Sequence, residues 1–182
     1  MARMRLYAPL VFLPHTHVEN LPRGSVVIDV SSYADFPWRT FSPMWVHGGI
    51  PVPGRPGTLS DTVEGIWQGL KVIRGKTAPR YFRGPDQKRG GKPSGHQWGL
   101  KLLDIVKARF QIYKVAYEWV LEHRIDPGLI EQLIQPALGG TTQYVHDVED
   151  NGNINNGVAP LAHASLLVQY VNRRCEERLT GH

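Results

Sequence analysis

Hydrophobic residues follow the spacing of an amphipathic helix most clearly in residues 60–73. They recur three or four positions apart, which places them on one face of a helix: Val63, Ile66, Trp67, Leu70 and Ile73. Ser60 or Asp61 can cap the start of this helix, and Asp61 and Glu64 have the spacing of a capping box. Gly65 and Gly69 each cost a helix about 1 kcal/mol relative to alanine. We expect them to clear one side of the helix, so that a backbone or a flat ligand can approach closely.

A second helical pattern covers residues 99–123 and is the longest in the chain. Its apolar positions form a wide stripe: Leu102, Val106, Phe110, Tyr113, Tyr117, Val120 and Leu121. A last helix is expected over residues 159–179, with Pro160 in its first turn. We expect these two helices and the helix over residues 60–73 to form the core.

Shorter patterns complete the expected fold. They predict an edge segment or first strand in residues 1–13, a buried strand in 26–30, a short helix in 126–134 that Pro136 and Gly139-Gly140 stop, and a strand in 142–148. The whole pattern predicts a mainly helical α+β fold with a few short strands. The length suits one compact domain over residues 1–182, with its core at about 25–179.

Positive charge is concentrated in residues 74–97. The chain has 21 Lys and Arg against 16 Asp and Glu, a net charge of +5. Residues 74–97 alone have a net charge of +6, with Asp86 as their single acidic residue; the basic residues are Arg74, Lys76, Arg80, Arg83, Lys88, Arg89 and Lys92. We expect a flexible basic loop here. It either binds phosphate, in a nucleotide or a nucleic acid, or is a solvated loop that aids solubility.

Several classes of site and protein are disfavoured by the sequence. Cys175 is the single cysteine, so there is no intramolecular disulfide and no cysteine cluster for a metal. His15 and His17 lack further ligands nearby in sequence, and no dinucleotide fingerprint or nucleophile elbow is present. Residues 84–92 differ from a P-loop because Pro93 follows Lys92. No apolar run has transmembrane length. We therefore expect a soluble, cytoplasmic protein without a metal or cofactor.

Polar candidates for a binding site lie in three places. Glu64, Gln68 and Lys71 share one face of the first helix with Trp67 alongside, although a helix start with ordinary surface polar residues has the same pattern. The aromatic segment 33–45 contains Arg39 and is either core or a surface that stacks a base and holds a phosphate. The glycine-rich loop 47–54, with Gly48, either presents backbone N–H groups to a ligand or only connects elements.

Residues 147–157 are rich in Asp, Asn and Gly and allow more than one interpretation. Their spacing partly matches an EF-hand loop, but position twelve is Val158 rather than Glu. An Asn/Gly turn with local side-chain hydrogen bonds is another interpretation. His163 follows near the start of the last helix, where a positive charge is disfavoured, so a neutral imidazole is expected there.

The pattern Glu64-x-x-Trp67-Gln68-x-x-Lys71 resembles the hallmark helix of the NADAR (YbiA-like) family. Weaker similarities extend over about residues 38–175: Phe41-Ser42-Pro43, the pair Lys107 and Phe110 in a long helix, and the acidic-glycine loop 147–157 before a helix with Leu161, Leu167 and Arg173. Gly65 stands where that family often has His, and its late Trp-Gly-x-Gly is absent. The resemblance is therefore to a divergent branch.

The resemblance implies an N-glycosidase that hydrolyses an N-glycosidic bond of a ribosyl-phosphate or ADP-ribose-type substrate, including an ADP-ribosylated nucleobase. Glu64 would stabilise the oxocarbenium-like centre or activate water, and Asp147, Glu149 or Asp150 would supply a second acidic group. The residues expected to bind the substrate are Arg39, Phe41, Ser42, Gly48, Trp67, Gln68, Lys71, Asn151 and His163.

Two further hypotheses concern binding without catalysis. The same pocket can hold a nucleotide, ADP-ribose or a nucleic-acid end without cutting it. Alternatively, residues 74–97 bind nucleic acid through their charge, with an affinity that falls steeply with salt. Each hypothesis predicts an anionic nucleotide-type small molecule or a modified nucleic acid as the partner, and none involves a membrane.

Overall fold

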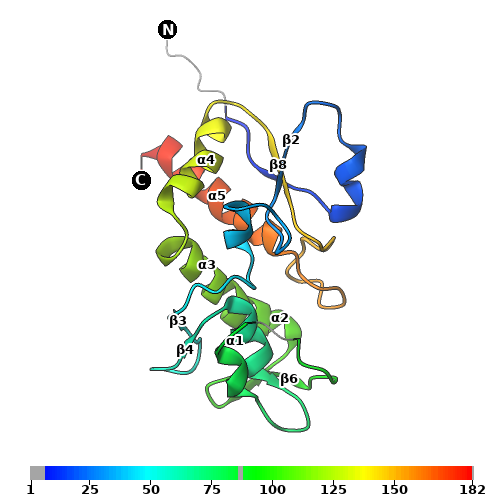
Figure 1. Ribbon diagram of the computed structural model, residues 1–182, viewed down its shortest axis with the longest axis vertical. Coiled ribbons are helices and arrows are strands. Elements are labelled where there is room, and N and C mark those ends of the chain that lie inside the picture. The colour runs from blue at the N-terminus through cyan, green and yellow to red at the C-terminus, as the bar shows by residue number, and fades with distance from the viewer. Residues whose placement is uncertain (1–6, 86–87, 182) are drawn as a thin grey trace. The chain divides into compact units, whose positions relative to one another are not determined.

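The computed structural model describes residues 7–85 and 88–181, so Arg3 and Arg5 of the expected first segment, and Asp86 of the basic segment, lie outside the described residues (Figure 1). The fold is a mixed α+β one. Its helices are α1 (Val63–Leu70), α2 (Ile105–Ala108), α3 (Lys114–His123), α4 (Pro127–Leu138) and α5 (His163–Thr180). Its strands are β1 (Val11–Phe12), β2 (Val26–Asp29), β3 (Ile50–Pro51), β4 (Leu59–Ser60), β5 (Lys71–Val72), β6 (Gly95–Trp98), β7 (Lys101–Leu103) and β8 (Gln143–His146).

Contacts between residues divide the chain into two compact units. Unit 1 comprises residues 1–42, 125–153 and 159–182, and unit 2 comprises residues 43–124 and 154–158. Each unit therefore contains segments that are distant in sequence. The expectation of one domain over the whole chain stays a prediction, and the two units are described separately below.

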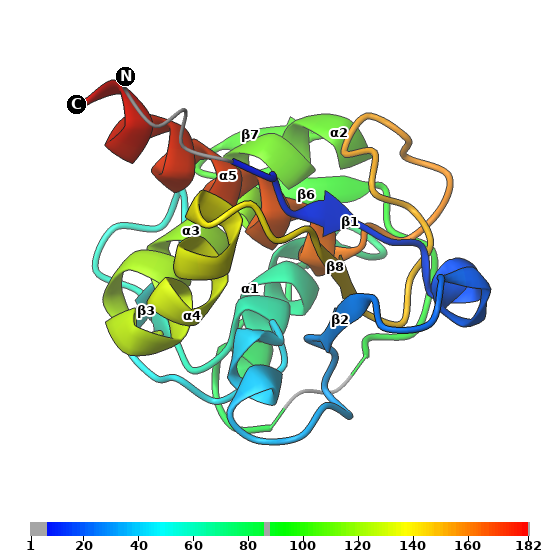
Figure 2. The ribbon, with the colours of Figure 1, turned by 90° about the horizontal axis from the view of Figure 1, so that it is seen from above.

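Unit 1 is built on a three-stranded parallel sheet with the order β1-β8-β2 (Figure 2). The strands expected in residues 26–30 and 142–148 are confirmed, and the edge strand expected near the N-terminus is β1. Helices α4 and α5 pack against each other, and both contact the central strand β8. The expectation that residues 26–30 are buried throughout is wrong. Val26 and Val27 are about two-fifths exposed because β2 lies at the edge of the sheet.

Unit 2 contains α1, the antiparallel sheet β5-β6-β7 and the two-stranded ladder β3-β4 (Figure 1). Helix α1 is shorter than the expected 60–73 because the chain turns directly into β5 at Lys71. Its cap is Thr62 and not Ser60 or Asp61. The Thr62 hydroxyl accepts a hydrogen bond from the Gly65 N–H at 2.8 Å.

The two glycines of α1 face a short 3-10 helix, η3 (Pro79–Phe82). A Cβ atom on Gly65 would lie 2.5 Å from the Tyr81 carbonyl oxygen, and one on Gly69 would lie 2.3 Å from the Phe82 ring. The close approach that the sequence predicts is thus made by backbone and an aromatic ring of the same unit. Segment 74–97 is accordingly not one continuous loop, because it contains η3 and the start of β6.

The single helix expected over residues 99–123 is wrong in two respects. Residues 101–103 form β7, and a π-helical turn, η4 (Arg109–Tyr113), separates α2 from α3. A π-turn adds a residue to the helical period, so the expected apolar stripe changes face. Phe110, within η4, is consequently 42% exposed, whereas Tyr117 and Val120 are buried as expected. Leu102 lies on β7 and not on a helix, and is 57% exposed.

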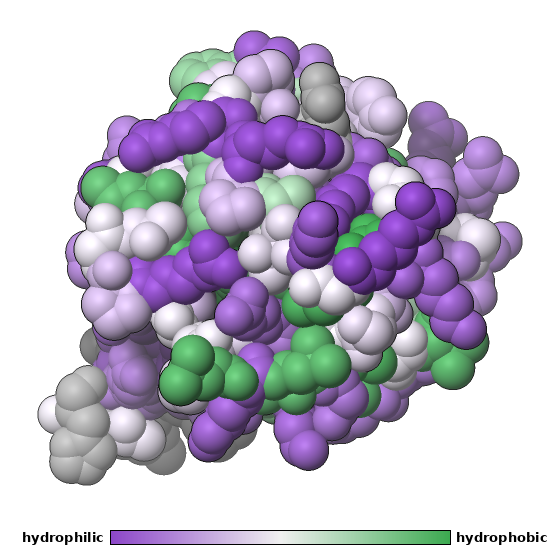
Figure 3. All heavy atoms as spheres, turned by 90° about the horizontal axis from the view of Figure 1, so that it is seen from below, coloured by the Kyte–Doolittle hydropathy of each residue, from purple (hydrophilic) through white to green (hydrophobic). Residues whose placement is uncertain are grey.

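Proline positions also differ from expectation. Pro136 was expected to stop its helix but lies inside α4, which continues to Leu138. Pro160 was expected in the first turn of the last helix, but α5 begins three residues later, at His163. Among the described residues no helix is long and apolar enough to cross a membrane. The surface seen in Figure 3 is largely hydrophilic and its hydrophobic patches are separate from one another.

Candidate functional site

Three polar side chains of unit 2 form a hydrogen-bonded row that runs along α1, from Glu64 in its first turn to Lys71 at the start of β5. Gln68 donates from Nε2 to Glu64 Oε1 at 2.5 Å and accepts at Oε1 from Lys71 Nζ at 2.8 Å. The Arg89 N–H also donates to Gln68 Oε1, at 3.1 Å. Because Gln68 is buried and held at both ends of its amide, its orientation is set. Glu64 and Gln68 share a face of α1 as expected, whereas Lys71 reaches Gln68 from β5 rather than from the helix.

Lys71 carries its ammonium group into a partly desolvated position. Burial lowers the pKa of Lys71, the Glu64 carboxylate acts in the opposite direction, and the cations of Lys88 and Arg89 lower it further. The net result is a pKa below the ordinary value for lysine. A partly desolvated ammonium attracts an incoming anion more strongly than a fully hydrated one does, because less water screens its charge.

His96 completes this group, and the sequence analysis missed it. It lies on β6 opposite Lys71 of β5, and paired residues of adjacent strands project to the same face of a sheet. Its ring stacks on Trp67 with a centroid separation of 3.8 Å, and the Tyr113 ring contacts Trp67 edge-on at 5.4 Å. No sequence pattern pointed to this arrangement, because residues 74–97 were expected to be a loop.

The His96 ring is buried without compensation. It is 1% exposed, and neither ring nitrogen has a hydrogen-bond partner among the residues that the structure describes. Burial, with a smaller contribution from the Lys71 charge, lowers the pKa of His96 to about 3. A neutral imidazole that lacks partners is unusual in a protein interior and indicates a strained or functional position.

We call this group the α1 site. It consists of Glu64, Trp67, Gln68, Lys71 and His96. It combines a half-buried carboxylate, an amide of set orientation, an ammonium, a neutral imidazole and an aromatic face. A carboxylate can stabilise a developing positive charge or accept a proton from water. Amide and ammonium groups can donate hydrogen bonds to sugar hydroxyl or phosphate oxygens.

The predicted acidic residues and His163 belong to unit 1 and have a different character. Asp147 Oδ2 lies 2.9 Å from His163 Nδ1 and also accepts from the Ala164 N–H at 2.9 Å. Its Oδ1 accepts from the Glu149 N–H at 2.7 Å. Burial by itself raises the pKa of Asp147, but the His163 ring and the two N–H donors outweigh it, and the pKa is below the ordinary value.

His163 is the first residue of α5 and is buried. Its Nε2 faces the Val30 carbonyl oxygen at 2.9 Å, while Nδ1 faces the Asp147 carboxylate. Each ring nitrogen therefore faces an acceptor of the same unit. The contacts join β2, the loop after β8 and α5, which is a structural role.

The rest of segment 147–157 forms local turns. Asp150 Oδ1 accepts from the N–H of Thr16, which is distant in sequence, at 2.9 Å. Within the segment, Asn151 Oδ1 accepts from the Asn153 N–H at 3.0 Å, and Asn156 Oδ1 accepts from the Val158 N–H at 3.2 Å. These contacts support the interpretation as an Asn/Gly turn with side-chain hydrogen bonds. The part of the chain that the structure describes has no group of three His, Cys, Asp or Glu residues that could hold a metal ion. The EF-hand interpretation has no support from it.

The remaining substrate-binding candidates divide between the two units. Phe41 and Ser42 are buried in unit 1, where Phe41 stacks on Trp38 at 6.1 Å, and Arg39 of the same segment is exposed. Gly48 belongs to unit 2, but its N–H donates to the Asp61 carbonyl at 3.0 Å and its carbonyl accepts from Arg124. Gly48 therefore acts as connecting chain in these contacts.

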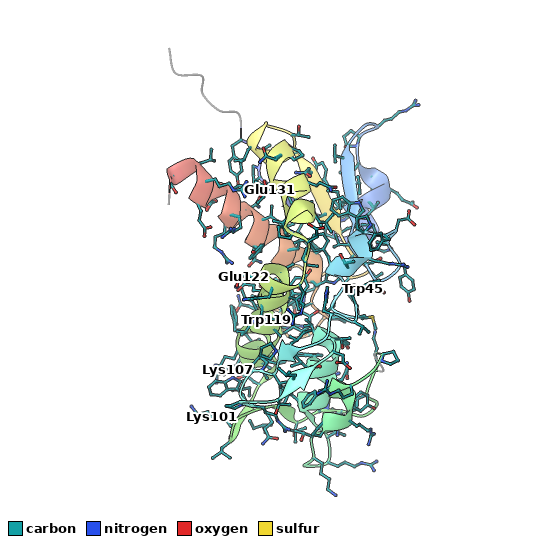
Figure 4. All side chains as sticks on the ribbon, turned by 60° about the vertical axis from the view of Figure 1, so that its left-hand side comes forward. Trp45, Lys101, Lys107, Trp119, Glu122 and Glu131 are labelled. Carbon is teal, nitrogen blue, oxygen red and sulfur yellow. The ribbon has the colours of Figure 1, made fainter. Side chains whose placement is uncertain are left out.

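Two residues that carried part of the family resemblance lie in one helical run over residues 105–123, Lys107 on α2 (Figure 4) and Phe110 on η4. Both are exposed, and Lys107 pairs with Asp104 at 3.2 Å. Trp119 of α3 stacks on His123 at 4.7 Å. These residues lie on helices of unit 2, but none of their contacts named here involves the α1 site.

Comparison with protein families matches residues 13–167 to the model of a family of unknown function, DUF6939. Comparison with curated proteins found no match. Comparison with solved structures found no match either.

Proposed function

The chain belongs to the DUF6939 family of unknown function, and we propose that it is an N-glycosidase that hydrolyses an N-glycosidic bond of a ribosyl-phosphate or ADP-ribose-type substrate. An ADP-ribosylated nucleobase is one such substrate. The proposal starts from the resemblance of Glu64-x-x-Trp67-Gln68-x-x-Lys71 to the hallmark helix of the YbiA-like family. A YbiA-like fold is part of the same proposal.

One observation carries the proposal: the hydrogen-bonded row from Lys71 through Gln68 to Glu64. A row of this kind holds a carboxylate in place without neutralising it, since its direct partner is a neutral amide. Departure of a base from C1 of a ribosyl group leaves positive charge on the sugar, and the Glu64 carboxylate would stabilise that charge or take a proton from the attacking water.

The other residues of the α1 site would position the substrate. Lys71 would donate to a sugar hydroxyl or a phosphate oxygen, and Gln68 would hold both flanking side chains in register. Trp67 would line the site with its aromatic face. The assignment of a second acidic group to Asp147, Glu149 or Asp150 stays a prediction from the resemblance. Of these three, Asp147 is already engaged with His163 and two backbone N–H groups.

The test is turnover by the wild type and by Glu64→Gln. Each protein is incubated with NAD, ADP-ribose, ADP-ribosylated guanosine, ADP-ribosylated DNA and phosphoribosyl pyrimidines, and liberated base and sugar are measured by mass spectrometry. We expect release from at least one substrate by the wild type and a loss of at least about 100-fold in Glu64→Gln. Glu122→Gln is the matched control, because Glu122 is an exposed carboxylate on α3 of the same unit (Figure 4).

The second candidate function is binding of the same class of ligand without cleavage. It is favoured by the unpartnered His96 ring and the desolvated Lys71, which offer hydrogen bonds and charge and do not require catalysis. A ligand that raises the melting temperature and is recovered intact from the wild type would establish this function. Equal turnover by the wild type and Glu64→Gln would reject the role of Glu64.

A further inference from the structure

Unit 2 contains a cavity of about 860 Å³ next to the α1 site. It is lined by the turn after β5, by η3 and by the segment around Arg89: Ile73, Arg74, Lys76, Thr77, Ala78, Pro79, Arg80, Tyr81, Arg89, Gly90 and Gly91. Its size falls in the range of cavities that hold small-molecule ligands and cofactors, roughly 300–1,000 Å³.

The charge of the lining has one sign. Arg74, Lys76, Arg80 and Arg89 contribute four cations, and no acidic residue among those that the structure describes lines the cavity. None of the four forms an ion pair with a carboxylate of the described residues. Cations that lie close together without counter-charges repel one another, and a bound anion relieves this repulsion.

Backbone conformation gives a second indication. Arg74 and Gly75 form a two-residue turn between Ile73 and Lys76, with φ angles of +51° and +73°. Arg74 is the one non-glycine residue with positive φ among those that the structure describes. Turns of this kind favour Asn or Gly at both positions. An arginine held there at a conformational cost indicates that its side chain is used.

The cavity wall is fixed and is joined to the α1 site through Arg89. The Arg89 guanidinium donates to the carbonyl oxygens of Lys71 and Lys76, and its N–H donates to Gln68. On the η3 side, the Arg80 guanidinium lies over the Tyr81 ring at 5.2 Å from its centroid. Arg89 is thus ordered by carbonyl groups, while Arg74, Lys76 and Arg80 are exposed and available to a ligand.

We propose that this cavity is a binding site for a phosphorylated small molecule of nucleotide size. Arg74, Lys76 and Arg80 contact the phosphate oxygens, because guanidinium and ammonium groups form the strongest hydrogen bonds to phosphate. Ile73, Pro79 and Tyr81 provide apolar surface for the remainder of the molecule. Binding in the cavity is independent of cleavage, and only its identification as the phosphate site of the substrate rests on the proposed function.

The test uses ADP, pyrophosphate and adenosine as probes in calorimetric titrations of the wild type, the double variant Lys76→Gln/Arg80→Gln and a control, Arg23→Gln. Arg23 is an exposed cation of unit 1, so its removal lowers the net charge without touching the cavity. We expect ADP to bind at least about tenfold more tightly than adenosine, and the double variant to lose at least about tenfold in affinity for ADP and pyrophosphate. Arg23→Gln should change these affinities by less than about twofold.

Arg74→Asn sharpens the test, because Asn suits the turn and lacks the charge. We expect a higher melting temperature together with weaker ADP binding. Unchanged ADP affinity in the double variant overturns the proposal. Binding of long single-stranded RNA without any binding of ADP also overturns it, since the site would then serve nucleic acid.

The same variants separate this proposal from the proposed function. ADP binding that depends on Lys76 and Arg80, with no base release from any substrate, leaves the cavity assignment standing and removes the glycosidase. Release that depends on Glu64, with the KM of Lys76→Gln/Arg80→Gln unchanged, removes the identification of the cavity as the phosphate site of the substrate and leaves the glycosidase standing.

Discussion

Each unit has a polar group with buried members, and the two groups differ in how their members are satisfied. In unit 1, each carboxylate oxygen of Asp147 accepts hydrogen bonds, and both ring nitrogens of His163 face acceptors. In unit 2, His96 has no partner for either ring nitrogen among the described residues, and Lys71 is partly desolvated beside a half-buried Glu64.

The difference distinguishes a structural group from a candidate site. A buried carboxylate–imidazole pair whose polar atoms all face partners joins elements and leaves nothing for a ligand. A buried imidazole without partners destabilises the fold, and such a cost is typical of positions that act on another molecule. Asp147, which the sequence analysis proposed as a catalytic acidic residue, thus has hydrogen-bond partners for both carboxylate oxygens. His96, which has none among the described residues, was not recognised from the sequence.

The largest loss of stability is expected for the Asp147–His163 group of unit 1. Asp147→Asn removes the charge that faces His163 and places an amide near the N–H donors of Glu149 and Ala164. Breaking a buried pair costs about 3–5 kcal/mol, so we expect a loss of that order in the free energy of unfolding. Urea denaturation at neutral pH measures it. Asp150→Asn is the control, because Asp150 is exposed, and should cost less than about 1 kcal/mol. If the two variants lose equal amounts of stability, Asp147 is not the structural residue that its contacts indicate.

The next largest effect is the pH dependence of the free energy of unfolding that is caused by His96. The pKa of His96 is lowered from 6.5 to about 3 in the fold, so the unfolded chain binds an additional proton between these values. Stability is therefore lost as the pH falls from about 6.5 to about 3, by at most roughly 1.4 kcal/mol per pH unit and on the order of 4 kcal/mol in total. His96→Phe keeps an aromatic ring against Trp67 and should flatten this slope, measured by urea denaturation from pH 7 to pH 4.

The Asp147 carboxyl affects stability in a different pH range from His96. Its pKa lies below the ordinary value of 3.8, so its contribution to stability is complete above that value and is lost as the pH falls below it. Loss of stability in His96→Phe should therefore begin only near pH 4, whereas in the wild type it begins near pH 6.5. A wild-type curve that is flat between pH 4 and pH 6.5 would show that His96 has a partner in solution.

A smaller effect is expected at the glycine contact that holds α1. Gly69→Ala places a Cβ atom 2.3 Å from the Phe82 ring, and overpacking of this kind costs about 1–3 kcal/mol, partly offset by the helix propensity of alanine. Thermal unfolding measures the loss. Gly90→Ala has no atom within 4 Å of the added Cβ and should change the free energy of unfolding by less than about 0.5 kcal/mol. If both variants are equally stable, η3 does not hold α1 in place.

The smallest effect on stability is expected at Glu64. Glu64 is only half-buried, and glutamine keeps its shape and a carbonyl oxygen that can accept from Gln68. We expect Glu64→Gln to change the free energy of unfolding by less than about 1 kcal/mol, measured by urea denaturation. A loss comparable to that of Asp147→Asn would place Glu64 in a structural group and would remove the basis for its proposed role.

Local sequence patterns were sufficient to predict the elements whose apolar residues recur at a regular spacing. Helix α1 was predicted because its apolar spacing and its two glycines are properties of adjacent turns. The row of Glu64, Gln68 and Lys71 followed from the same helical geometry, although Lys71 itself belongs to β5. Strands β2 and β8 followed from short apolar or alternating runs, and the basic excess of residues 74–97 is a matter of composition.

Tertiary structure decided everything that depends on residues distant in sequence. The choice of Thr62 over Asp61 as the cap depends on Asp61 accepting from the Gly84 N–H, 23 positions away. The burial of His96 depends on pairing between β5 and β6, and the satisfaction of Asp147 depends on the start of α5. Hydrogen-bond partners and desolvation are set by such long-range contacts. The sequence by itself therefore determined which polar side chains each element carries, and the fold determined which of them were left to contact a ligand.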